Sequence, residues 1–192
     1  MNRMLIAGVL ACLAWVYGFP GSAAEPVAKS RFKAGDRAPD FSLRDREGNL
    51  LRLSDRAYPG KELPRRPKQV LLLDFFATDC KACREELPQI VELSKKRKDI
   101  QVLLVAIPEA EDGQRKLEDF LKDHPVPFPV LVDTYQTAAR KYVATQDSIT
   151  LPALFLIGKS GRIRAVWMGL EKDLMFQVEK ILPSPVQPAT TP

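Results

Sequence analysis

Hydrophobic and polar positions follow two alternating periods along this chain, which predicts alternating strands and helices. Residues 70–76 and 102–107 are nearly continuous apolar runs, the pattern of strands that are buried on both faces of a sheet. Residues 81–98 and 114–123 instead carry apolar side chains three and four positions apart, as helices with one buried face do. The same patterns predict the later elements, which are a strand at 129–132, a helix at 136–142, strands at 153–157 and 163–168, and a helix at 171–182.

This order of elements predicts an α/β fold. We expect a three-layer sandwich, with a mixed central sheet between flanking helices. Residues 41–53 precede the alternating elements and predict a small β-hairpin that turns at 47–49.

The first 24 residues have the pattern of a targeting segment. Arg3 is followed by an almost entirely apolar run at 4–16 and by small residues at 22–24. We therefore expect residues 1–24 to be a signal peptide that is cleaved before Glu25. Two alternatives remain open, namely that this segment stays as a membrane anchor or that Cys12 is lipidated.

The rest of the chain predicts one domain and a tail. Residues 25–182 contain all the predicted strands and helices and are long enough to bury one substantial core. Residues 183–192 hold four prolines and no charge, which is typical of a disordered terminus.

Composition narrows the possible chemistry. A chain of 192 residues that is 45% hydrophobic and 28% charged is typical of an ordinary globular protein, and a net charge of +5 is too small to indicate nucleic-acid binding. Three cysteines and one histidine exclude a four-cysteine zinc site and a multi-histidine metal site. We expect no metal, no cofactor and no nucleic-acid partner.

Cys80 and Cys83 are the candidate chemical groups. They lie where the buried strand at 70–76 gives way to the helix at 81–98. The positive end of a helix dipole stabilises a thiolate, so the first cysteine can attack a disulfide and the second can resolve the mixed disulfide. A purely structural disulfide that closes so short a loop would stabilise the fold only weakly, which favours redox chemistry.

The surrounding segment, residues 73–88, resembles the active-site segment of thioredoxin-like proteins. Three further features match that family, namely a buried acid six residues before the first cysteine, a proline in the following helix, and a cis-proline that faces the disulfide. By this resemblance they are Asp74, Pro88 and Pro152. Cys80, Cys83, Asp74 and Pro152 are therefore the expected catalytic residues.

The flanking sequences resemble one branch of that family. Residues 35–43 are similar to an element shared by peroxiredoxins and TlpA-like thiol–disulfide oxidoreductases, and residues 83–88 are typical of the TlpA-like branch. The resemblance covers residues 33–182 and implies a secreted or membrane-tethered periplasmic protein. It also implies reduction of disulfides in specific envelope proteins, for example in cytochrome c or metal-centre maturation, with electrons from a membrane donor.

Two acidic residues near the cysteines each allow two interpretations. Asp74 would carry the proton of Cys83, because burial raises the pKa of a carboxyl group, or it would pair with a lysine across the sheet. Asp79 stands where the family usually has tryptophan. It would either raise the pKa of Cys80 by its charge or serve as the N-cap of the helix, and the N-cap role is the preferred interpretation.

Two other functions remain as alternatives. A peroxiredoxin-like peroxidase shares the element at 35–43, but its cysteine usually follows a threonine by three positions, whereas Thr78 is two positions before Cys80. A Sco-type copper-binding assembly protein uses cysteines one residue further apart and a distant histidine. The single histidine here, His124, lies before the strand at 129–132, and we expect it at the surface.

Overall fold

A computed structural model describes residues 29–57, 69–109, 111–144 and 148–182. The predicted targeting segment and the predicted tail lie outside the described residues. No helix in the described ranges combines the length and the hydrophobicity that crossing a membrane requires.

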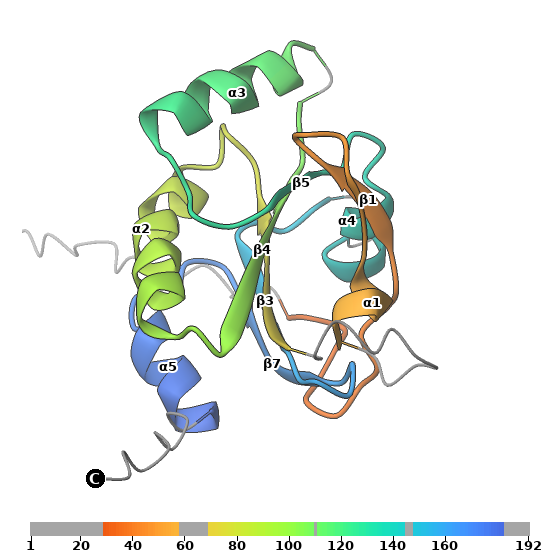
Figure 1. Cartoon of the computed structure of the whole chain (residues 1–192), viewed down its shortest axis with the longest axis vertical. Helices are drawn as coiled ribbons and strands as arrows, with labels where there is room; N and C mark the ends of the chain where they lie inside the picture. Colours follow the sequence, from red (N-terminus) through yellow and green to blue (C-terminus); the bar gives the residue numbers. More distant parts are fainter. Residues whose placement is uncertain (1–28, 58–68, 110, 145–147, 183–192) are drawn as a thin grey trace, which may run out of the picture.

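The described residues form one mixed sheet of seven strands in the order β2-β1-β5-β4-β3-β6-β7 (Figure 1). Strands β3, β4 and β5 are parallel, and β6, β7, β1 and β2 run antiparallel to their neighbours. The strands are β1 (Ser42–Asp45), β2 (Leu50–Arg52), β3 (Val70–Phe76), β4 (Ile100–Ala106), β5 (Val130–Val132), β6 (Ala153–Ile157) and β7 (Ile163–Met168).

Helices cover both faces of the sheet, which confirms the three-layer fold. Helices α2 and α5 lie on one face and α1 and α4 on the other, while α3 lies across the end of the sheet (Figure 1). The helices are α1 (Leu53–Ala57), α2 (Lys81–Lys96), α3 (Gly113–Asp123), α4 (Thr137–Tyr142) and α5 (Leu174–Ile181).

Strand β3 divides the core between the two faces of the sheet. Because side chains alternate along a strand, Leu71, Leu73 and Phe75 pack towards α1 and α4, whereas Leu72 and Phe76 pack towards α2, α3 and α5. Asp74 is two residues from both Leu72 and Phe76, so its side chain lies on the same face of the sheet as theirs. The register of β3 therefore places the one acidic side chain of this strand in the layer below α2.

Most predicted elements are present, with small differences at their ends. The hairpin at 41–53 is confirmed as β1 and β2, and its strand β1 also pairs antiparallel with β5, which the sequence did not predict. Helix α5 starts at Leu174 instead of residue 171, because residues 169–173 form a loop that is bonded to α2. Helix α1 was not predicted, since five residues are too few to show a helical period.

Candidate active site

The two cysteines lie where the sequence predicts, at the junction of β3 and α2. They form a disulfide, with Cα atoms 5.3 Å apart. Cys80 is the N-cap of α2, and its sulfur accepts a hydrogen bond of 3.1 Å from the backbone N–H of Cys83. Cys80 is partly accessible, whereas Cys83 is only 2% exposed. The first cysteine is thus more accessible to a partner than the second.

Pro152 lies beside this junction. The Leu151–Pro152 peptide bond is cis, as the resemblance implies. Ala153 of β6 pairs with Phe75 of β3, so Pro152 lies next to the end of β3. Strand β3 ends at Phe76, four residues before Cys80. Leu151 packs against the same apolar cluster as Cys80 and Cys83. The register thus brings the cis-proline loop and the disulfide to the same end of the sheet.

Asp74 is buried below α2, with 2% of its surface exposed. Its Oδ1 atom has no hydrogen-bond partner, and no lysine or arginine of the described chain is within ion-pair distance of its carboxyl group. Burial raises the pKa of Asp74 well above its usual value, and the charge of Glu86 adds to this rise. The alternative of a lysine partner across the sheet is therefore wrong for the described residues.

Glu86 is a second buried carboxyl group, one turn after Cys83 on α2. It is fully buried, and its Oε1 accepts a hydrogen bond of 3.0 Å from the backbone N–H of Glu171. Its Oε2 has no hydrogen-bond partner. Burial raises the pKa of Glu86 to about 7, opposed by the hydrogen bond from Glu171 and assisted by the charge of Glu171. The site therefore contains a carboxyl group that titrates near neutral pH.

Comparison with known proteins agrees with this geometry. The family model of the AhpC/TSA family matches residues 34–166. The chain belongs to the AhpC/TSA family. It is 31% identical to the thiol-disulfide oxidoreductase ResA of Geobacillus kaustophilus over 161 residues, which cover 81% of this chain and 82% of the relative.

Two solved structures show the same fold. The structure of a putative thiol:disulfide interchange protein DsbE from Chlorobium tepidum is 27% identical with a TM-score of 0.62, and the match covers 78% of this chain and 94% of that one. The exposed lipoprotein thioredoxin Etrx1 of Streptococcus pneumoniae is 27% identical with a TM-score of 0.56, over 75% of this chain and 100% of that one. Within the AhpC/TSA family, the chain is a thiol–disulfide oxidoreductase of the TlpA-like type.

Asp79, the residue that departs from the TlpA-like pattern, is not a helix cap. The N-cap of α2 is Cys80, so the N-cap interpretation of Asp79 is wrong. Asp79 is exposed, and its charge acts on Lys116 of α3, whose pKa is raised first by a hydrogen bond to Glu109 and last by Asp79. Because Lys116 already pairs with Glu109, Asp79 makes only the smallest contribution to the pKa of Lys116.

Glu86 was missed in the sequence analysis, although a signal for it exists. The buried face of α2 carries Cys83, Leu87, Ile90 and Leu93, which are spaced as a helical stripe, and Glu86 lies within this stripe. A charged residue in an apolar stripe is a candidate for a perturbed carboxyl group.

His124 lies where the sequence predicts, at the surface. It is the C-cap of α3 and stacks on Phe120 with ring centroids 4.3 Å apart, while its Nδ1 is 3.1 Å from the Phe120 carbonyl oxygen. Among the described residues no group of three or more histidine, cysteine, aspartate or glutamate side chains could hold a metal ion.

Proposed function

We propose that this protein reduces disulfide bonds in specific partner proteins outside the cytoplasm, with Cys80 as the nucleophile and Cys83 as the resolving thiol. The observation that carries this proposal is the unequal burial of the two cysteines at the start of α2. Cys80 is open to a partner at the N-terminus of the helix, whereas Cys83 is almost fully enclosed. Only the first cysteine can meet a disulfide of another protein.

The proposed reaction moves two electrons from the dithiol to the partner. The Cys80 thiolate attacks one sulfur of the partner's disulfide, a mixed disulfide forms, and the partner's other sulfur leaves as a thiolate. Cys83 then loses its proton and attacks the sulfur of Cys80, which releases the second partner sulfur and forms the Cys80–Cys83 bridge. A dithiol electron donor in the membrane would reduce this bridge again.

The proton of Cys83 is assigned in this proposal to the two buried carboxyl groups. Asp74 of β3 and Glu86 of α2 are both buried between this strand and this helix. Each has one carboxyl oxygen without a hydrogen-bond partner. A carboxyl group with a pKa near 7 can accept and return a proton at neutral pH. Pro152 would line the surface on which the partner's cysteine segment lies.

The proposed location follows from the first 24 residues and from the relatives. Residues 1–24 would be a signal peptide or a membrane tether, residues 25–182 the thioredoxin-like domain, and 183–192 a disordered tail. The similarity to an exposed lipoprotein thioredoxin supports an extracytoplasmic site. Proteins that mature cytochrome c or metal centres are the proposed kind of partner.

Trapping of mixed disulfides tests this proposal. A Cys83→Ser variant, expressed in the envelope of its own cell, should accumulate mixed disulfides with partner proteins, and thiol reductants should cleave these complexes. A Cys80→Ser variant should form none, because its remaining thiol is buried. Complexes formed by Cys80→Ser and not by Cys83→Ser would show that the two roles are reversed.

A peroxidase function is the second candidate, because residues 35–43, which are similar to an element of peroxiredoxins, lie within the match to the AhpC/TSA family model. In this case the Cys80 thiolate would attack hydrogen peroxide. Consumption of peroxide by the reduced protein at a rate above that of free dithiothreitol would favour this candidate, whereas the proposed reductase should react with peroxide no faster than the free thiol.

A further inference from the structure

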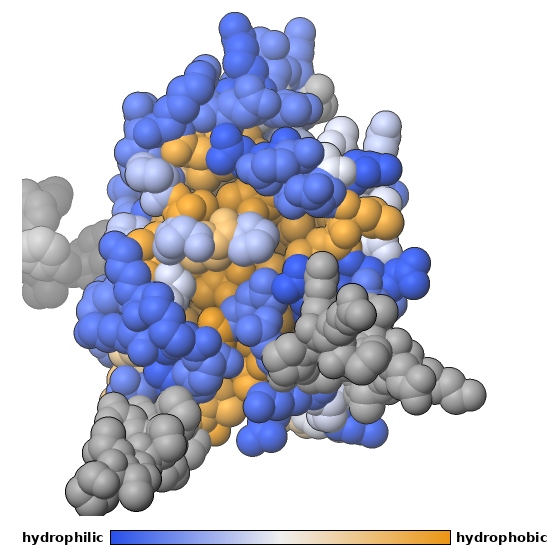
Figure 2. All heavy atoms as spheres, viewed as in Figure 1, coloured by the Kyte–Doolittle hydropathy of each residue, from blue (hydrophilic) through white to orange (hydrophobic). Residues whose placement is uncertain are grey.

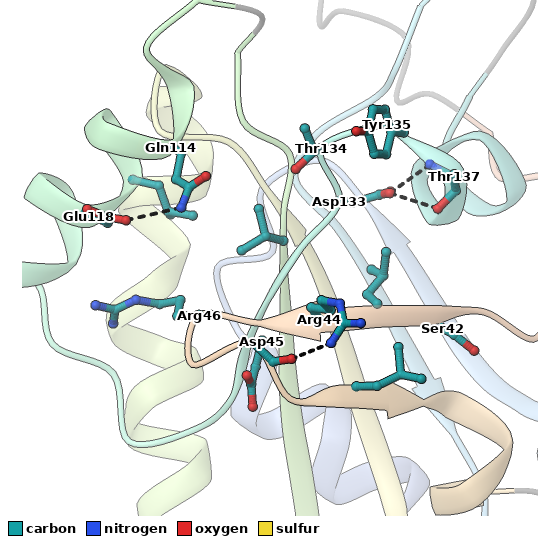
Figure 3. A pocket seen from close by; sticks show the side chains of 15 residues that line it. Ser42, Arg44, Asp45, Arg46, Gln114, Glu118, Asp133, Thr134, Tyr135 and Thr137 are labelled. Atoms are coloured by element: carbon teal, nitrogen blue, oxygen red, sulfur yellow. Dashed lines mark hydrogen bonds between the residues drawn. The ribbon is translucent and has the colours of Figure 1, made fainter.

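A cleft of about 550 Å³ lies at the end of β5, is not lined by either cysteine, and has no part in the proposed electron transfer. Its walls are the β1–β2 hairpin, helix α3 and the loop between β5 and α4. Gln114 and Glu118 reach it from α3, Thr134 and Tyr135 from the loop, and Arg44 and Arg46 from the hairpin (Figure 3). Three segments that are far apart in the sequence therefore enclose one surface depression.

The cleft opens at the same end of the sheet as the dithiol. Phe76 pairs with Ala106, and Ala106 pairs with Val132, which lines the cleft. Two strand spacings separate Phe76 from Val132, or about 10 Å. Since Cys80 follows Phe76 by four residues, the cleft and the dithiol are at the same end of the sheet.

The rim of the cleft exposes side chains that are frequent in protein interfaces. Tyr135 is 83% exposed and Leu50 is 61% exposed, and both line the cleft. In the described chain only one other large hydrophobic residue, Phe176 of α5, is exposed to this degree. Figure 2 shows this face of the molecule, with apolar side chains between the charged surfaces of α2 and α3. Tyrosine and arginine on an open rim are typical of interface hot spots, whereas small-molecule sites enclose most of their ligand.

The acidic groups of the cleft are engaged by its own backbone and side chains. Asp133 accepts hydrogen bonds of 2.7 to 3.1 Å from the amides of Thr137, Ala138 and Ala139 and from the Thr137 hydroxyl. Asp45 accepts hydrogen bonds from the backbone and side-chain amides of Asn49. Glu118 accepts a hydrogen bond of 3.3 Å from the side chain of Gln114.

The cationic groups of the cleft are not engaged by acidic ones. Arg44 donates one hydrogen bond, of 2.7 Å, to the carbonyl oxygen of Gly48, and in the described chain neither Arg44 nor Arg46 has a carboxylate within ion-pair distance. Glu47 belongs to the same turn but does not line the cleft. Asp45, Glu118 and Asp133 keep their negative charges, because their hydrogen-bond donors are neutral, so the lining is not positive overall. What the cleft offers to a carboxylate from outside is two guanidinium groups that have no acidic partner among the described residues.

The β1–β2 hairpin and the loop between β5 and α4, which form two walls of the cleft, are held in place before any ligand binds. The hairpin turn is closed by hydrogen bonds between Asp45 and Asn49, and Gly48 has the positive φ of 85° that this turn requires. The loop that carries Tyr135 is fixed by Asp133, which also accepts the N–H of Gln136 through its carbonyl oxygen. Docking would therefore order few new groups, which favours affinity.

We propose that this cleft docks an extended segment of a partner polypeptide that carries carboxylate and apolar side chains. The carboxylates would pair with Arg44 and Arg46, and the apolar side chains would pack on Leu50 and Tyr135. This inference rests on the proposed function, since the segment would belong to a protein whose cysteines meet Cys80. The cleft would then select partners by a contact that is separate from the disulfide.

The test uses binding of a peptide without cysteine to the whole chain in its oxidised form. The probe is acetyl-Gly-Asp-Leu-Asp-Phe-Gly-amide, and its control replaces both aspartates by asparagine. Two-dimensional NMR of the labelled protein should show shifts of the backbone amides at 44–50 and 133–137. The asparagine peptide should bind at least tenfold more weakly, because it offers no carboxylate.

Protein variants identify the surface. Arg46→Glu and Tyr135→Ala change exposed side chains and should each weaken the binding of the acidic peptide at least fivefold. The matched control is Arg164→Glu on β7, an exposed arginine at the opposite edge of the sheet, which should change binding less than twofold.

Three results would overturn the inference. The first is that the peptide causes no shifts of the backbone amides at 44–50 and 133–137, and the second is that Arg164→Glu weakens peptide binding as much as Arg46→Glu does. The third is that acetate or inorganic phosphate shifts the same amides with an affinity within threefold of the peptide's. The last result would mean a site for small anions. Because the probe has no cysteine, these results do not depend on the trapping experiment that tests the dithiol chemistry.

Discussion

The free energy of unfolding should decrease as the pH rises towards 7, because Glu86 ionises, and replacement of Glu86 by glutamine should abolish this decrease. Glu86 is fully buried, and burial raises its pKa from 4.5 to about 7. A carboxyl group whose pKa is raised by folding binds more protons in the folded than in the unfolded state between these two values. The free energy of unfolding of the wild-type protein therefore falls as the pH rises from 4.5 towards 7, and the lost stability does not return above pH 7.

The size of the effect follows from the two pKa values. Between pH 5 and pH 8 this group should lower the free energy of unfolding by about 2.5 kcal/mol, since each unit of pKa difference corresponds to about 1.4 kcal/mol. Glu86→Gln keeps the carbonyl oxygen that accepts the N–H of Glu171 but cannot ionise. Loss of the Glu86 charge also lowers the pKa of Asp74, which acts in the same direction.

The assay is urea unfolding of the oxidised protein at pH 5, 6, 7 and 8. The difference in the free energy of unfolding between Glu86→Gln and wild type should grow by about 2.5 kcal/mol from pH 5 to pH 8. Glu85→Gln, at the exposed neighbouring position, is the control and should follow the wild-type curve. A gap between Glu86→Gln and wild type that stays constant within about 0.5 kcal/mol would refute the reasoning, because Glu86 would then titrate alike in both states.

Three further changes have defined outcomes. Asp79→Trp should lower the pKa of Cys80 by about half a unit to one unit in a thiolate titration of the reduced protein, and Asp79→Asn should reproduce most of this shift because both remove the charge; an unchanged or higher pKa would contradict the electrostatic argument. Asp74→Asn should slow the resolution of a mixed disulfide at least about tenfold in single-turnover measurements at pH 7, and a rate within about twofold of wild type would show that Asp74 does not take the proton of Cys83. Arg97→Ala should lower the free energy of unfolding by about 1 to 2 kcal/mol, because this arginine donates two hydrogen bonds of 2.8 Å to Asp99, whose side chain is 32% exposed. An unchanged free energy of unfolding would show that the pair contributes nothing.

Features that depend on nearby residues could be predicted from the sequence. The strands at 153–157 and 163–168 have the predicted bounds, because each is a short apolar run that is limited by turn residues. The position of the dithiol follows in the same way from the Cys-x-x-Cys spacing at the end of a buried strand. The side of the sheet on which Asp74 lies is also a local property, since it follows from the alternation of side chains along β3.

Features that depend on distant packing could not be predicted. Glu86 accepts a hydrogen bond from the N–H of Glu171, which is 85 residues away in the loop at 169–173. The pairing of β1 with β5 involves two residue pairs, Arg44 with Val132 and Asp45 with Leu131, and no period in the sequence indicates it. The cap of α2 was assigned to Asp79 on the preference of aspartate for N-caps, but the sulfur of Cys80 accepts the hydrogen bond instead.

The stability and the chemistry of this site depend on the same atoms. Oδ1 of Asp74 and Oε2 of Glu86 are buried without hydrogen-bond partners, an arrangement that costs stability whenever the groups are charged. A pair of apolar side chains would avoid that cost, so packing alone gives no reason for two carboxyl groups below α2. A proton acceptor for the resolving thiol does give a reason, because a group that is solvated and fully ionised at pH 7 would be a weaker base. The pH dependence of unfolding and the pH dependence of disulfide exchange should therefore both change in Glu86→Gln. If this variant altered the pH dependence of unfolding but not that of disulfide exchange, the buried carboxyl pair would have no role in the reaction.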